Sequence, residues 1–139
     1  MATPLVPMVM DRVIEAALEE DLSSGDLTTE SCIDEAAQAV AEAVARHPMV
    51  ACGGEVFARV FTKIDPSLAV ETVSPDGASV AKGAVLWRVK GRARSILMGE
   101  RTALNLVQRM CGVATTTKKY VDALAPGSTT RVIDTRKTT

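Results

Sequence analysis

The last residues of the chain carry side chains suited to binding an anion. Arg136, Lys137, Thr138 and Thr139 directly follow an apolar stretch at 130–134. A strand over that stretch would place them at its carboxyl end, the edge where α/β sheets bind ligands. Arginine offers a planar fork for a carboxylate, and lysine adds a mobile positive charge. A carboxylate or phosphate site is therefore one interpretation. On position alone, a solvated basic end is the commoner one.

A second candidate lies on a helix predicted over 94–111. Arg101 and Asn105 are four residues apart and share one helical face, with Glu100 beside them and Arg109 further along. Such a polar stripe can bind an anion or contact another subunit. From spacing alone, the solvent-exposed face of the helix is the commoner interpretation.

Other reactive residue types form no recognisable site. Glu20, Asp21 and Asp26 have the oxygen ligands of a cation site, but turn formation and charge at the end of a helix explain them better. The single histidine, His47, has no residue that would orient it as a base, so we expect it at the surface or in a turn. Three cysteines without a close pair argue against a zinc site or a disulfide framework and favour a reducing compartment. The sequence names no catalytic base and no metal ligand.

Composition favours a folded, cytoplasmic protein. The 139 residues are 47% hydrophobic, which suffices for a core. The net charge of −1 offers no general attraction to nucleic acid or to an anionic membrane. No apolar run approaches the roughly 18 to 20 residues that span a bilayer.

Hydrophobic periodicity predicts an α+β protein. The first helix, over 8–22, is expected to bury Val9, Val13 and Leu18, and Trp87 is expected in the core. Further helices are predicted over 55–64 and 94–111, the latter interrupted at Gly112 and continued to about 125, and strands over 36–46, 68–73, 79–80, 85–89 and 130–134. A small, mostly antiparallel sheet with helices on it would form an α/β sandwich domain at 1–92. Residues 93–139 would hold connecting helices and the first strand of a βαβ series that does not continue, as in a truncated α/β barrel.

Three segments together resemble the quinolinate phosphoribosyltransferases, also called nicotinate-nucleotide pyrophosphorylases (carboxylating). The first is the acidic and glycine-containing stretch at 20–29, the second runs from Glu100 and Arg101 through Gly112 to Thr115, and the third is 134–139. Each is weak alone, but their order and separation make chance agreement improbable. The resemblance covers nearly the whole chain from about Met8.

The resemblance implies a head-to-tail homodimer of chains that each hold an amino-terminal sandwich and a barrel of parallel strands. Family members transfer the phosphoribosyl group of phosphoribosyl pyrophosphate to quinolinate with Mg²⁺, giving nicotinate mononucleotide, pyrophosphate and CO₂. By analogy Arg136, Lys137 and Thr138 would bind quinolinate at the barrel mouth, and Arg101 would reach in from the neighbouring subunit. Ligands of Mg²⁺ are expected outside this chain.

The later barrel strands of the family have no counterpart here, so we expect this chain to be incomplete for catalysis. Two alternatives remain open. A nicotinate phosphoribosyltransferase or a molybdenum-transport-associated homologue would share the architecture and differ in the substrate pocket. A non-catalytic assembly module would use Arg101 and the basic end only for subunit contacts.

Overall fold

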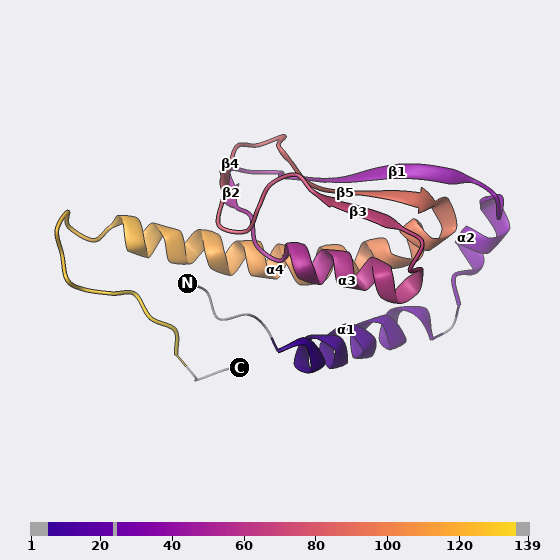
Figure 1. Ribbon diagram of the computed structural model, residues 1–139, viewed down its shortest axis with the longest axis horizontal. Coiled ribbons are helices and arrows are strands. Elements are labelled where there is room, and N and C mark those ends of the chain that lie inside the picture. The colour runs from indigo at the N-terminus through magenta and orange to yellow at the C-terminus, as the bar shows by residue number, and fades with distance from the viewer. Residues whose placement is uncertain (1–5, 24, 136–139) are drawn as a thin grey trace.

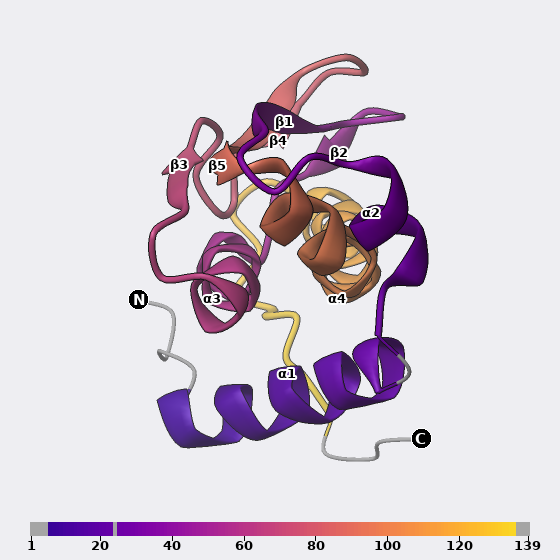
Figure 2. The same ribbon diagram turned by 90° about the vertical axis from the view of Figure 1, so that its right-hand side faces the viewer.

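Three layers make up the fold of residues 6–23 and 25–135, the part of the chain that the computed structural model describes. Figure 2 shows a β-sheet, helices α3 and α4 beneath it, and helix α1 below these two. The elements in chain order are α1 (Pro7–Leu22), α2 (Leu27–Cys32), β1 (Gln38–Val44), β2 (Met49–Val50), α3 (Gly54–Ile64), β3 (Ala69–Thr72), β4 (Ser79–Val80), β5 (Val85–Arg92) and α4 (Ala93–Asp122). An α+β domain with an antiparallel sheet is therefore confirmed.

The main sheet has the strand order β1-β5-β3, and both pairings are antiparallel. Strand β1 alternates between exposed and inward positions, which is the period of two that predicted a strand over 36–46. Its Ala41 pairs with Val89 of β5. Strands β2 and β4 form a separate two-stranded sheet beyond one end of the main sheet (Figure 1).

Aromatic side chains fill the space between the sheet and α3. Trp87 of β5 has no exposed surface, as expected for a core residue. Its ring stacks on Phe57 at a centroid distance of 5.1 Å, and Phe57 meets Phe61 edge-on at 5.0 Å. With Val56 and Val60, the two phenylalanines form the buried stripe of this helix, as their helical spacing predicts, while Ile64 in the same stripe is only partly buried.

Helices α3 and α4 approach each other closely at Gly99. A β-carbon at this position would lie 2.8 Å from Cε1 of Phe61, so only glycine allows this spacing. Ile96 and Ala103, about one turn to either side, belong to the same core as the sheet. The predicted division at residues 92 and 93 stays a prediction.

The predicted interruption at Gly112 is wrong, because α4 continues through it to Asp122. A single glycine costs a helix only about 1 kcal/mol. Contacts on both sides of Gly112 hold the helix in place: Cys111 is buried, and Thr115 Oγ1 accepts a hydrogen bond from the amide of Val50 at 2.9 Å.

Helix α1 forms as predicted but buries a different face. Met10 and Ile14 are buried, whereas Val9 and Val13 are 55% and 54% exposed. Leu18 packs against the core, as expected. The helix carries apolar residues on two adjacent faces, and periodicity alone does not choose between them.

Ion pairs to α3 select the buried face of α1. Asp11 accepts hydrogen bonds from Arg59 Nε at 2.7 Å and Nη2 at 3.1 Å, and Lys63 donates to Glu15 at 2.6 Å. These pairs fix the rotation of α1 about its axis, since their partners lie on one side of α3. The charged residues Asp11 and Glu15 of α1 thus border its interface with α3.

The predicted strand at 130–134 is also wrong, since residues 128–135 form neither helix nor strand and Ile133 is 82% exposed. A strand requires a neighbour to pair with, and no strand of the described residues lies against this segment. Among residues 6–23 and 25–135, none of the helices combines the length and apolar character that a membrane crossing requires.

Candidate functional site

A half-open cavity brings together two segments that the sequence singled out. It has a volume of about 780 Å³ and lies where the end of α1 and the start of α2 face the first half of α4. Asp21, Asp26 and Thr28 come from the first segment, and Arg101, Asn105 and others come from the second. The full lining is Asp21, Leu22, Gly25, Asp26, Leu27, Thr28, Leu97, Met98, Glu100, Arg101, Leu104, Asn105 and Gln108.

Arg101 presents an anchored positive charge at this cavity. Its Nη1 donates a hydrogen bond to Asp21 Oδ1 at 2.6 Å. The arginine side chain is 75% exposed, whereas that of Asp21 is only 17% exposed. The hydrogen bond to Asp21, together with the charges of Asp21, Asp26 and Glu100, holds the pKa of Arg101 above its ordinary value. The guanidinium is therefore held from the protein side and open to ligands on the other.

Asp26 shapes the wall of the cavity as the N-cap of α2. Its Oδ1 accepts a hydrogen bond from the amide of Thr29 at 3.0 Å, which satisfies one free N–H of the first helical turn. The hydrogen bonds from Thr29 lower the pKa of Asp26, with a smaller contribution from Arg101. This role in a turn confirms the interpretation of Asp26. The helix itself, Leu27–Cys32, is missing from the sequence prediction, although the Asp-Leu-Thr-Thr-Glu pattern is typical of a capped start.

The polar residues predicted to share one face of α4 line two different surfaces. Asn105 and Gln108 line the cavity with Arg101, and Gln108 Nε2 donates a hydrogen bond to Asn105 Oδ1 at 3.4 Å. Arg109 points instead to an apolar groove on another side of the helix, lined by Met110, Val113 and neighbouring residues. Only the first part of the predicted stripe accompanies Arg101.

The other predicted substrate-binding residues, Arg136, Lys137 and Thr138, lie outside the described residues. Their convergence with Arg101 on one ligand stays a prediction. Among residues 6–23 and 25–135, no three histidine, cysteine or acidic side chains come together as metal ligands.

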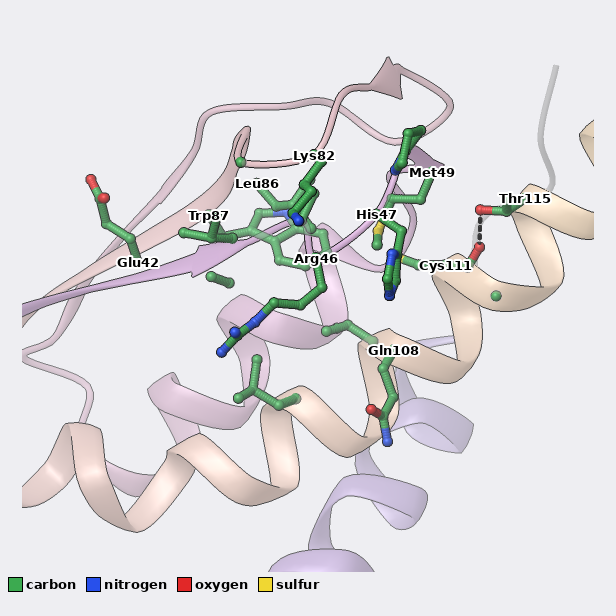
Figure 3. A pocket seen from close by; sticks show the side chains of 18 of the residues that line it. Glu42, Arg46, His47, Met49, Lys82, Leu86, Trp87, Gln108, Cys111 and Thr115 are labelled. Atoms are coloured by element: carbon green, nitrogen blue, oxygen red, sulfur yellow. Dashed lines mark hydrogen bonds between the residues drawn. The ribbon is translucent and has the colours of Figure 1, made fainter.

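A second cavity, of about 830 Å³, separates the β1–β2 and β4–β5 turns from α4 (Figure 3). Leu86 and Trp87 contribute to its apolar wall, and Arg46 and Lys82 line it from the two turns. His47 lies exposed in the bend after β1, as the sequence predicts. The hydrophobic periodicity of the sequence does not predict this cavity, because its walls come from segments that are far apart in sequence.

Fold and site together define an α+β domain that presents one anchored arginine at a polar cavity. Residues 26–111 match the family described as quinolinate phosphoribosyl transferase, N-terminal domain. The chain is 38% identical over 127 residues to quinolinate phosphoribosyltransferase [decarboxylating] 1 of Nicotiana glauca, a match that covers 91% of this chain and 35% of that protein. It is 36% identical over 132 residues to a probable nicotinate-nucleotide pyrophosphorylase [carboxylating] of Synechocystis, covering 95% of this chain and 44% of that one.

Solved structures show the same relationship. The crystal structure of NadC from Streptococcus pyogenes matches with a TM-score of 0.92 and 37% identity, over 99% of this chain and 49% of that one. The nicotinate-nucleotide pyrophosphorylase from Francisella tularensis matches with a TM-score of 0.80 and 30% identity, over 86% of this chain and 42% of that one. The chain therefore belongs to the quinolinate phosphoribosyltransferase family, as the sequence resemblance predicts. It spans less than half the length of these relatives.

Proposed function

We propose that this chain contributes Arg101 and the surrounding cavity wall to the active site of a quinolinate phosphoribosyltransferase. The reaction would transfer the phosphoribosyl group from phosphoribosyl pyrophosphate to quinolinate and release pyrophosphate and CO₂, giving nicotinate mononucleotide for NAD biosynthesis. The observation that carries the proposal is the Arg101 guanidinium, 75% exposed and anchored by Asp21. Family membership supplies the substrate class.

The chemistry of quinolinate fits this arginine. Quinolinate carries two adjacent carboxylates, and a guanidinium binds a carboxylate through two parallel charge-assisted hydrogen bonds. The ion pair to Asp21 is the one hydrogen bond of Arg101 within the described part of the chain, and it uses Nη1. Nε and Nη2 are thus available for a bidentate contact. Holding the acid in place would orient its ring nitrogen toward the anomeric carbon of the phosphoribosyl group.

Residues beyond the described structure complete the proposal. Arg136, Lys137 and Thr138 would bind the quinolinate carboxylates from the other side. Mg²⁺ would accompany phosphoribosyl pyrophosphate and stabilise charge on the leaving pyrophosphate, with ligands outside the described residues. We also propose a cytoplasmic homodimer in which Arg101 serves the site of the neighbouring subunit. Its exposure at an open cavity, rather than in a closed pocket of its own domain, supports this shared arrangement.

The direct test is quinolinate binding by a protein that carries this chain together with the complementary barrel. Calorimetry should show that Arg101→Ala weakens quinolinate binding by at least roughly tenfold, which is the loss of one charge-assisted contact. Arg109→Ala is the matched control, because this residue lies on the same helix but lines a different groove. Equal affinities of the two variants would contradict the role of Arg101.

The same measurement separates the alternatives. Tighter binding of nicotinate than of quinolinate would favour a nicotinate phosphoribosyltransferase, and weak binding of both would favour the molybdenum-transport-associated homologue. A non-catalytic assembly module predicts no rise in melting temperature with quinolinate, whereas a true site stabilises the folded state by mass action.

A further inference from the structure

Two of the three cysteines, Cys52 and Cys111, contact each other although they are far apart in sequence. Cys111 Sγ lies 3.3 Å from the backbone nitrogen of Cys52, which donates to it, and 3.3 Å from the backbone oxygen, which accepts from the thiol. The separation of 59 residues conceals this pair in the sequence. In a disulfide the α-carbons are about 4 to 7 Å apart, and a sulfur seated on the partner's backbone is within that reach.

The two thiols differ in exposure in a way that suits stepwise oxidation. Cys52 is half-buried and lines the apolar groove beside Met110 and Val113, which is open to solvent. Cys111 is only 4% exposed and lies on α4 at the wall of the second cavity (Figure 3). Burial is the main reason that the pKa of each thiol lies above its ordinary value of 9.0. Reaction with an oxidant is therefore slow at neutral pH.

The backbone around Cys52 is held in place by neighbouring hydrogen bonds. The next two amides, of Gly53 and Gly54, each donate to the Asp76 carboxylate at 3.0 Å. Thr115, one turn beyond Cys111, accepts from the amide of Val50 at 2.9 Å. These contacts keep the segment before α3 against α4, so the backbone on either side of the cysteine pair is held close together.

We propose that Cys52 and Cys111 form a reversible disulfide that ties the β2–α3 junction to the middle of α4. The inference is independent of the proposed catalytic function. The bond would close a loop of about 60 residues and so reduce the freedom of the unfolded chain. It would also fix α4 ten residues after Arg101.

Oxidised glutathione is a sufficient oxidant. The Cys52 thiolate attacks it, which forms a mixed disulfide on Cys52 and releases one glutathione thiolate. The Cys111 thiolate then attacks the Cys52 sulfur and releases the second glutathione. The two protein thiols lose two electrons in total, and their protons pass to the two glutathione molecules.

The test uses the 139-residue chain with Cys32→Ser, because Cys32 is exposed and would otherwise join chains together. After incubation with oxidised glutathione, the intact mass should fall by two hydrogen atoms. Proteolysis without reductant should give one cross-linked pair of peptides that contain residues 52 and 111. The melting temperature should rise by roughly 5 to 15 °C and return to the starting value with dithiothreitol.

Matched variants identify the bond. Cys32→Ser with Cys52→Ser, and Cys32→Ser with Cys111→Ser, should show no loss of mass and no rise in melting temperature. Two alkylatable thiols after oxidation and unfolding of the Cys32→Ser chain would overturn the proposal. A glutathione adduct on Cys52 that never resolves would overturn it as well, because the second thiol would then be out of reach. Peptide mapping gives this answer even if a double variant fails to fold.

Discussion

Asp21, in the last turn of α1, holds Arg101 of α4 through a 2.6 Å ion pair across 80 positions of sequence. The carboxylate is largely covered while the guanidinium is largely exposed. An arginine anchored in this way would lose less side-chain freedom on binding the proposed ligand. The contact also brings the acidic stretch near residue 20 and the arginine near residue 100 together at one cavity.

Replacing Asp21 with Asn should weaken quinolinate binding without unfolding the domain. We expect a roughly 2- to 10-fold rise in the quinolinate KM of a complete enzyme carrying this chain, with a smaller change in kcat, because one side chain must then be ordered on binding. Glu20→Gln is the control, since Glu20 is exposed on the same turn of α1. Steady-state kinetics on both variants checks this. An unchanged KM in Asp21→Asn would show that Arg101 needs no anchor.

Replacing either of two glycines on α4 with alanine should change the stability of the fold in opposite directions. Gly99→Ala places a methyl group 2.8 Å from Phe61 and should destabilise the fold by about 1–3 kcal/mol through overpacking. Gly112→Ala meets no atom within 4 Å and should stabilise it by about 0.5–1 kcal/mol, because alanine is the better helix former. Urea unfolding followed by the fluorescence of Trp87, the single tryptophan, gives both values. Similar effects of the two substitutions would mean that the helices do not meet at Gly99.

Local patterns predicted most of the fold, because they depend on residues close in sequence. The alternating burial of β1 follows from a repeat of two residues, and the apolar stripe of α3 follows from the helical repeat. Family motifs likewise directed attention to Arg101 before any partner was known.

The sequence-based predictions fail where contacts between residues far apart in sequence determine the structure. The buried face of α1 depends on ion pairs from Asp11 and Glu15 to α3, which no window of the sequence contains. Helix α4 passes through Gly112 because Cys111 and Thr115 are tied to the β2 region. For the same reason, Asp21 could not be recognised as the partner of Arg101 from the sequence.

Acid should unfold the domain partly through Asp11. Its hydrogen bond with Arg59 lowers the pKa from the ordinary value of 3.8 to about 2. A carboxyl group whose pKa is lower in the folded state stabilises the fold at pH values above 3.8, and this contribution is lost as the pH falls toward about 2. Asp65, with its pKa also held low by Arg92, contributes in the same direction.

Asp11→Asn should therefore reduce the loss of stability between pH 4 and pH 2 without abolishing it, since Asp65 remains. Urea midpoints measured across this range, with Trp87 fluorescence as the signal, test the prediction. Glu19→Gln, an exposed change on the same helix, should keep the pH dependence of the unchanged chain. If Asp11→Asn loses stability with pH as steeply as that control, the ion pair with Arg59 does not form in solution.

Asp76 should stabilise the start of α3 from a turn 22 residues away. The N-cap residue Gly53 has a left-handed φ of 107° and no side chain to cap the helix. The two carboxylate oxygens of Asp76 replace that cap by accepting from the amides of Gly53 and Gly54. Asp76→Ala should cost about 1–2 kcal/mol in urea unfolding, as loss of a helix cap does. Asp76→Asn should destabilise the domain less than Asp76→Ala, because the amide oxygen of asparagine still accepts one hydrogen bond. It should still destabilise the domain, because the negative charge that is favourable near a helix N-terminus is lost. If the unchanged chain and both variants are equally stable, water solvates the amides of Gly53 and Gly54 just as well, and α3 begins without help from this turn.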